Sequence, residues 1–454
     1  MEASDPISTR TGHKPTYDRS PLAAFAQASI QSAQRLAVPV LIFVVVLSVY
    51  YFLNHQPAAL FKHYVYQAEA FLQGSLDVKA AGMPDFYHDA VDVDGKRYLA
   101  FPPMPSVLLL PFVALWGPAF EQANLSVAIG AINVVLLWHL LGLLNISRTT
   151  KLLLVPFFAF GTVHFFAATS GTAWHYAHVS AVFFLLLAII FLLRRAPPII
   201  PAVLLGFAFL SREPTILAAP FFAYWLVRQR HESILSKEAL LDKQSLFQAS
   251  LFAAGLVPFV AFWFWYNFTR FGGPLETGYD TIYLGYLQTN NYSFYRGLFP
   301  DAPHFNLFDV RSVPLHLYTI FLMPPQFIPD QEARLPLPIG HWAVLRPSPY
   351  GMSVLLTSPA FIYAALAKRN DVLKYGSWMA IGLISVPLLL HFSQGWFQFG
   401  YRFLLDFAPF LLILTAFGFD DNRSPGARRL QALLVAVAIL AGFWGLFWGT
   451  KLGW

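Results

Sequence analysis

The chain has 454 residues, of which 57% are hydrophobic and 12% charged, and it contains no cysteine. Soluble domains carry about twice that charged fraction, so the composition excludes an ordinary soluble protein, and the lack of cysteine excludes disulfides and thiol catalysis. The net charge of +6 arises from Lys and Arg in short segments between apolar runs, as in membrane proteins. No basic block of the kind that binds nucleic acid is present.

Apolar runs long enough to cross a bilayer recur from end to end of the chain. The sequence therefore predicts an all-α polytopic membrane protein with about 11 to 13 transmembrane helices. Residues 1–35 are polar and lack a small-residue cleavage site, which predicts a cytoplasmic tail before a single transmembrane domain, 36–454. The apolar runs lie at about 36–54, 104–117, 122–144, 152–170, 176–193, 198–211, 214–227, 247–267, 350–367, 375–392, 403–419 and 429–449.

The first external loop, 55–103, begins with an amphipathic helix at 58–74. Its apolar residues recur with a period of 3.6, and Gly74 supplies a stop. The helix is too short and polar to span, so we expect it to lie flat at the membrane interface. The apolar residues are Leu60, Phe61, Tyr64, Val65, Ala68, Phe71 and Leu72.

Acidic residues then follow in quick succession in the same loop. A carboxylate held beside a bilayer is placed to act as general base on a hydroxyl, and partial desolvation raises its pKa toward a useful range. A solvated surface loop is the better interpretation for Asp92 and Asp94, since Asp94-Gly95 is a turn signal. For Asp89, which follows Tyr87 and His88, both interpretations stay open.

Basic segments at 148–151, 194–195, 228–243, 368–374 and 423–429 mark the cytoplasmic side. The opposite side then holds 55–103, 171–175, 212–213, 268–349 and 393–402. This assignment has one conflict, because 104–117 and 122–144 cannot both cross the membrane. Either the shorter segment is re-entrant or the charge bias fails at Arg148.

The stretch Ser170–His178 carries His175 and His178 one helical turn apart, a spacing that lets two imidazoles share a metal ion. No third ligand is evident nearby. We therefore favour an interfacial aromatic belt made of Trp174, His175 and Tyr176.

Two arginines stand where apolar segments meet the external side. Charges at membrane depth are usually functional or paired, so Arg212 and Glu213 predict an ion pair in which Glu213 fixes Arg212 for an anionic ligand.

Arg402 lies at the start of a predicted span, with Asp406 four residues on and on the same helical face. A guanidinium there suits a phosphate at headgroup depth. The alternative is a snorkelling arginine, but Asp406 inside an apolar run favours a polar cavity.

The segment 268–349 is rich in Pro and aromatic residues and predicts a folded external loop that covers the first one. It contains one short apolar piece, 315–323. At its start, three glycines permit tight turns near a ligand, and Glu276 is a second candidate carboxylate. A plain loop exit is equally compatible with this stretch.

Together these motifs resemble the GT-C superfamily, the integral membrane glycosyltransferases that use polyprenyl-phosphate sugars and include protein O-mannosyltransferases and aminoarabinose transferases. The resemblance covers roughly 36–420. It is carried by the aromatic interfacial helix and by His88-Asp89, Asp94-Gly95-Lys96 with Tyr98, Pro102-Pro103 with Pro105, FGGPLETGY at 271–279 and FGYRFLLDFAPF at 399–410.

The resemblance implies an acidic base in the first external loop, which transfers best to Asp89, with Asp85 second and His88 beside them. Many members place an acid near the end of the first span, where this chain has Leu53-Asn54-His55. The expected donor-phosphate ligands are Arg402, Arg212 and Lys96. The expected substrate contacts are Tyr98, Trp174, His175, Glu276, Tyr279, Gln398, Tyr401 and Asp406, with Tyr286 and Trp342 as further residues that stack on sugars.

The expected reaction is inverting transfer of a sugar from a polyprenyl-phosphate donor to a glycan, lipid or protein acceptor. It would take place at the extracytoplasmic face of the inner membrane. No cofactor is certain, and no metal-binding cluster is evident; some members of the superfamily need a divalent cation and others do not. Two alternatives remain: a flippase, whose inverted repeats are not evident, and a non-catalytic subunit that binds lipid-linked glycans.

Overall fold

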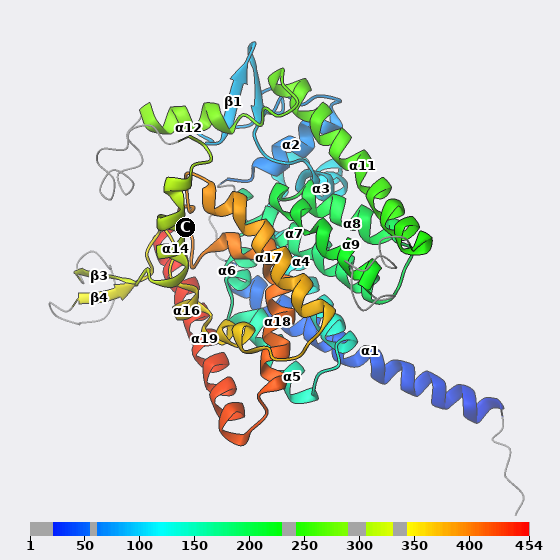
Figure 1. The fold of residues 1–454 in the computed structure, drawn as a ribbon. Coiled ribbons are helices and arrows are strands. Elements are labelled where there is room, and N and C mark those ends of the chain that lie inside the picture. The colour runs from blue at the N-terminus through cyan, green and yellow to red at the C-terminus, as the bar shows by residue number, and fades with distance from the viewer. Residues whose placement is uncertain (1–20, 55–60, 229–241, 289–305, 330–342, 454) are drawn as a thin grey trace, which may run out of the picture.

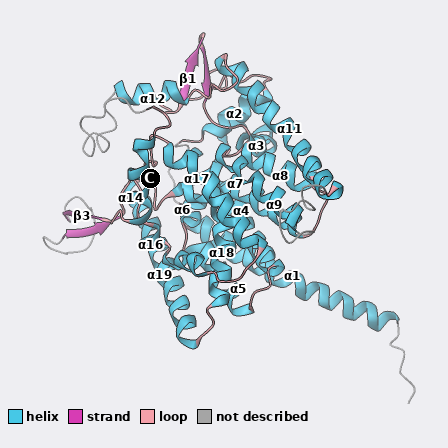
Figure 2. Cartoon of the chain, in the orientation of Figure 1, coloured by secondary structure: helices cyan, strands magenta, loops and turns pink. Residues whose placement is uncertain are grey.

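The computed structural model describes residues 21–54, 61–228, 242–288, 306–329 and 343–453, with side chains in the first helix from Leu36 onward and in the helix after Gly278 only as far as residue 284. It is 72% helical. Figure 1 shows the helices gathered into one body, and Figure 2 shows strands only in two hairpins at its periphery. The all-α membrane class predicted from composition is confirmed at this level.

Six helical segments of the described chain are long and apolar enough to cross a membrane. They are α4 (Gln122–Leu143), α7 (Ala173–Leu193), α11 (Lys243–Phe271), α17 (Val372–Leu390), α19 (Pro425–Leu452) and Arg402–Asp421, which comprises η5 (Arg402–Phe407) and α18 (Ala408–Asp421). A seventh span results if α5 (Arg148–Phe160) and α6 (Val163–Ser170), which meet at 43°, count as one.

Several predicted spans are shorter than the sequence suggested, so the described chain has fewer helices of spanning length than the predicted number. Residues 350–367 form α16 (Val354–Thr357) and the 3₁₀ helix η4 (Pro359–Leu366), because Pro359 disfavours helical geometry at Ser358. The other short elements are α3 (Met104–Trp116) with η1 (Gly117–Ala119), α8 (Ile199–Phe209), η2 (Glu213–Ala218) and α9 (Ala219–Arg228). Helix α1 (Pro21–Phe52) contains most of the predicted first span, and it begins within the segment 1–35 that the sequence assigned to a polar tail.

The two segments that the sequence assigned to external loops contain, among the described residues, both small sheets, three α-helices and one 3₁₀ helix. In the first loop, α2 (His63–Leu72) precedes an antiparallel hairpin of β1 (Ala90–Val93) and β2 (Lys96–Leu99), and Asp94-Gly95 forms the predicted turn. The second loop contains α12 (Tyr279–Gln288), η3 (Val310–Ser312), α14 (Val313–Phe321), β3 (Gln326–Pro329) and β4 (Ala343–Arg346). As predicted, it covers part of the first loop, because α12 packs against β1.

Both ends of α3 lie beside α2. At the start of α3, Ser106 Oγ donates a hydrogen bond of 2.6 Å to Gln67 Oε1. Just after its end, the ammonium of Lys62 donates to the carbonyl of Pro118 at 2.7 Å and pairs with Glu121 at 3.1 Å. Of the two segments in conflict in the predicted topology, 104–117 therefore runs alongside α2, and α4 is the one long and apolar enough to cross a membrane.

The opposite end of the bundle contains a cluster of ion pairs. Asp420, whose side chain is fully buried, pairs with Arg369 at 3.1 Å, with Arg423, and with Arg428 at 3.8 Å. Its carboxylate also accepts a hydrogen bond from the backbone N–H of Ser147 at 2.8 Å. Three segments that the sequence assigned to one side of the membrane are therefore joined at one end, far from α2 and the β1–β2 hairpin (Figure 1).

Helix α7 forms the centre of the bundle. It is apolar on every face, which is typical of a helix surrounded by protein rather than half exposed. In its most apolar stretch of 18 residues, 78% is buried inside the protein. It packs against α4, α8, α6 and η5. Its first turn therefore lies where the external loops and the bundle meet.

Close helix packing depends on small residues, as is common in membrane bundles. A Cβ atom at Gly418 of α18 would lie 1.7 Å from the carbonyl oxygen of Tyr363 in η4. We expect Gly418→Ala to lower the free energy of unfolding by about 1–3 kcal/mol or more through overpacking, as measured by thermal unfolding in detergent. The matched control is Gly382→Ala in α17, where a Cβ meets nothing within 4 Å. Equal stability of the two variants would contradict this packing.

Candidate functional site

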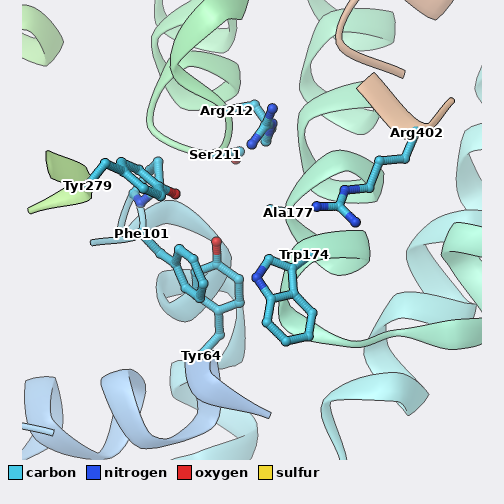
Figure 3. A pocket seen from close by; sticks show the side chains of 9 residues that line it. Tyr64, Phe101, Trp174, Ala177, Ser211, Arg212, Tyr279 and Arg402 are labelled. Atoms are coloured by element: carbon cyan, nitrogen blue, oxygen red, sulfur yellow. The ribbon is translucent and has the colours of Figure 1, made fainter. Parts of the chain in front are cut away.

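A small cavity of about 30 Å³ lies where α7 meets the external loops. Figure 3 shows that the hydroxyls of Tyr64 and Tyr279 and the guanidinium groups of Arg212 and Arg402 face the same space. These side chains come from segments far apart in the sequence. The complete lining is Tyr64 of α2, Phe101 and Pro102 before α3, Trp174 and Ala177 of α7, Ser211 and Arg212 before η2, Tyr279 of α12, and Arg402 of η5.

Arg212 is fixed by Asp406 rather than by Glu213. The guanidinium makes a bidentate contact with Asp406, with Nε to Oδ1 at 3.1 Å and Nη2 to Oδ2 at 2.9 Å. Asp406 is fully buried and also receives a hydrogen bond from Nδ1 of His178 at 2.7 Å. The sequence-based pairing was wrong, because Glu213 instead accepts a hydrogen bond from the indole N–H of Trp263 at 2.7 Å.

Arg402 lies at the start of η5, and its side chain reaches the cavity (Figure 3). Its Nη1 donates to the carbonyl oxygen of Trp396 at 3.0 Å, and its guanidinium lies 5.4 Å from the ring centroid of Phe403. The prediction that Arg402 and Asp406 share a helical face was wrong. At three residues per turn in a 3₁₀ helix, residues four apart do not align, so Asp406 is directed to Arg212 instead.

Asp89 lies directly behind the cavity wall. Its Oδ2 accepts a hydrogen bond of 2.6 Å from the indole N–H of Trp174, which itself lines the cavity. The backbone of Asp89 has a φ of +60°, in the left-handed region that aspartate tolerates better than most residues. The neighbouring His88 has an exposed side chain, and its carbonyl oxygen accepts a hydrogen bond from His63. The candidate base is therefore one indole away from the two arginines.

The other charged candidates of the first loop lie outside the cavity. Arg97 binds Asp85 at 2.6 Å and Asp92 at 2.9 Å on the exposed side of the hairpin. The hydrogen bond from Arg97 lowers the pKa of Asp92, which makes that carboxylate a weaker base. Lys96 is exposed beside the hairpin turn. Of the expected phosphate ligands, the structure thus brings together Arg212 and Arg402 but not Lys96.

Five further predicted contacts are also absent from the cavity wall. Tyr98 stacks edge-on against Phe271, and Glu276 accepts a hydrogen bond from the backbone of Gly278. Gln398 and Tyr401 are buried and bonded within the protein, Tyr401 to His316. Asp406 acts on the cavity only through Arg212. Trp342 and the side chain of Tyr286 lie outside the described residues.

The two histidines of α7 form neither a metal pair nor part of an interfacial belt. Nδ1 of His175 contacts the hydroxyl of Thr172 at 2.8 Å, whereas His178 bonds to Asp406. His175, His178 and Tyr176 are all buried inside the bundle, so the predicted belt was wrong for these residues. In the described part of the chain, no three His, Asp or Glu side chains are grouped to hold a metal ion.

Sequence reasoning named Trp174 and Tyr279 of the aromatic lining but missed Tyr64 and Phe101. Tyr64 was assigned only to the apolar face of the interfacial helix, and Phe101 carried no signal beyond its place before the Pro102-Pro103 motif. Ser211 was noted only as the neighbour of Arg212. Arg212, Arg402 and Asp406 were identified because they are charged residues within apolar sequence. Such residues are energetically unfavourable in a membrane protein and are usually paired or functional.

The cavity combines two guanidinium groups, two tyrosine hydroxyls and a nearby carboxylate, a set suited to an anionic ligand with hydroxyl groups. Its volume accommodates about two water molecules, whereas ligand pockets usually measure about 300–1,000 Å³. Binding of a larger ligand therefore requires lining side chains to move apart. The large side chains of the lining are Tyr64, Phe101, Trp174 and Tyr279, which lie across the cavity from the two arginines or beside them (Figure 3).

Neither a scan of protein-family models nor a search of curated proteins finds a match to this chain.

Proposed function

We propose that this protein is a membrane glycosyltransferase of the GT-C type that transfers a sugar from a polyprenyl-phosphate donor to a hydroxyl acceptor. The observation that supports this most is the cavity that Arg212 and Arg402 share with Trp174, whose indole holds Asp89. In this proposal the site faces the extracytoplasmic side of the inner membrane. Its position, at the end of the bundle opposite the clustered arginines, accords with that side.

The proposed reaction is a direct displacement. The carboxylate of Asp89 takes the proton of the acceptor hydroxyl, and the acceptor oxygen attacks the anomeric carbon. The bond between that carbon and the phosphate oxygen breaks, and its electron pair leaves with the polyprenyl phosphate. Arg402 and Arg212 stabilise the added negative charge on this leaving group. A single displacement inverts the anomeric configuration.

The ion pair with Asp406 gives Arg212 a defined orientation before substrate arrives. A bidentate contact uses Nε and Nη2, so the remaining nitrogen, Nη1, is positioned rather than mobile. Preorganised donors of this kind contribute more to transition-state stabilisation than donors that must reorient during the reaction. Arg402, tied to the carbonyl oxygen of Trp396, is oriented by a comparable contact.

The test uses the purified protein in proteoliposomes with a panel of radiolabelled polyprenyl-phosphate sugars and a cell-envelope extract that supplies glycan, lipid and protein acceptors. The proposal expects conversion of at least one donor to polyprenyl phosphate, with label recovered in an acceptor. Movement of an intact donor across the bilayer without conversion would instead identify a flippase. Binding of donors without conversion or movement would identify a non-catalytic subunit, and either result overturns the proposal.

Arg402→Ala provides a sharper test of the phosphate site. Charged hydrogen bonds contribute about 1.5–3 kcal/mol, so we expect the KM for the donor to rise about 10- to 100-fold. The matched control is Lys96→Ala, which removes a cation that the sequence also assigned to the phosphate but that lies on the exposed hairpin. Its donor KM is expected to stay within about twofold of wild type. The reverse pattern would place the phosphate at the hairpin.

A further inference from the structure

His63, the first residue of α2, is fully buried against the inner side of the first loop. Its ring centroid lies 4.7 Å from that of Tyr87, 5.4 Å from Phe101 and 5.5 Å from Trp174. Burial lowers the pKa of His63 against the opposing influence of the Asp89 carboxylate. With Phe61 stacked on it at 6.0 Å, the imidazole is surrounded by aromatic rings, and its burial favours the neutral form.

One ring N–H of His63 has a defined acceptor. Nε2 of His63 lies 2.8 Å from the carbonyl oxygen of His88. A carbonyl oxygen can only accept a hydrogen bond, so Nε2 carries a proton and donates it to this carbonyl oxygen. The carbonyl belongs to the peptide that joins His88 to Asp89, so the bond fixes the plane of that peptide.

The peptide needs to be held, because Asp89 follows it with a φ of +60°. For a residue with a side chain, the left-handed region costs about 1–2 kcal/mol. Such geometry persists only where surrounding contacts determine it. Two hydrogen bonds hold the conformation of Asp89. His63 binds the carbonyl oxygen of the preceding peptide, and Trp174 binds the Asp89 carboxylate.

We infer that His63 is a positioning residue for Asp89: it sets the peptide from which the carboxylate reaches Trp174 and the cavity. The inference rests on the proposed function, in which Asp89 takes the acceptor proton. His63 does not line the cavity, so it acts through Asp89 and not on substrate. A histidine that only filled the core would affect stability, whereas a positioning residue affects the chemical step.

The experiment compares His63→Leu with His63→Gln in the transfer assay. Leucine fills much of the ring volume but removes the donor, and we expect kcat to fall about 10- to 100-fold, the effect of a displacement of about 1 Å, with donor KM within about twofold. The side-chain N–H of glutamine can occupy the position of Nε2, so His63→Gln is expected to recover at least a third of wild-type kcat.

The matched control is His164→Leu, which removes an equally buried histidine packed between α1 and α4. It is expected to lower thermal stability while kcat changes less than about twofold, since a lost contact remote from the reacting groups affects folding alone. If His63→Leu changed kcat no more than His164→Leu, or if His63→Gln were as impaired as His63→Leu, the positioning role would be overturned.

Failure of the inference and failure of the proposed function give different results. Sugar transfer by wild type and its loss in Asp89→Asn test the function, whatever His63 does. Combining His63→Leu with Asp89→Glu tests the link, because two residues that act as a unit are not additive. We expect the double variant to have the kcat of Asp89→Glu alone. Multiplication of the two separate losses would show that His63 acts independently of Asp89.

Discussion

Replacement of Asp89 by asparagine is expected to reduce kcat for sugar transfer by about 10²- to 10⁴-fold, the usual contribution of a general base. The amide has nearly the shape of the carboxylate and its oxygen still accepts the hydrogen bond of 2.6 Å from Trp174. Asparagine also tolerates a φ of +60°. The loss should therefore appear in kcat, measured as conversion of a labelled donor, with an unchanged melting temperature and donor KM.

The matched control for this prediction is Asp85→Asn. Asp85 belongs to the same loop and is the second candidate base, but it pairs with Arg97 on the exposed side of the hairpin. Its substitution is expected to leave kcat within about twofold, because exposed ion pairs contribute little. Full activity of Asp89→Asn together with loss in Asp85→Asn would transfer the role of base to Asp85 and require a different path to the cavity.

Asp406→Asn is expected to have the largest effect on stability. Asp406 is fully buried and carries the charge that balances Arg212. Removing one partner of a buried ion pair costs about 3–5 kcal/mol, because the remaining charge is left without compensation. We therefore expect a lower free energy of unfolding, measured in detergent by thermal or denaturant unfolding, together with a higher KM for the donor.

A double replacement separates these two effects. Replacing the whole pair by Arg212→Met and Asp406→Leu removes both charges, and apolar substitution of a complete buried pair is often neutral or stabilising. We expect stability to return toward wild type while the donor KM remains high, since the phosphate ligand is gone. Recovery of donor affinity in the double variant would show that Arg212 serves only to balance Asp406.

The charged part of the candidate site could be predicted from the sequence, and its pairing could not. Arg212, Arg402 and Asp406 interrupt apolar sequence. Placing a charged side chain within an apolar segment is energetically unfavourable, so these residues stand out without a structure. The partner of Arg212 depends on how η5 lies against the segment before η2, which are separated by nearly two hundred residues. Local spacing therefore favoured Glu213 as the partner of Arg212 and placed Arg402 and Asp406 on one helical face, and both assignments were wrong.

In the fold, too, local sequence predicts some elements, whereas others depend on tertiary contacts. Long apolar runs such as α4 and α7 have enough length to identify a span by composition alone. The segments 214–227 and 350–367 are as apolar but contain prolines, and they form short 3₁₀ and α-helical pieces. The course of α3 alongside α2 is set by contacts with α2 and with the start of α4, which the periodicity of its own sequence does not reveal.

The helix that begins at Arg402 has consequences for the energy of the whole bundle. The continuous segment Arg402–Asp421 ends at Asp420 and Asp421, where carboxylates oppose the negative end of the helix macrodipole. The guanidinium groups of Arg369 and Arg423 offset them there. At the other end, a cation at Arg402 adds to the positive partial charge of the first turn. Under the proposed function, the donor phosphate places negative charge between Arg212 and Arg402, at this positive end of the segment. Because a ligand that binds only the folded state stabilises it, donor binding is then expected to stabilise the bundle as well.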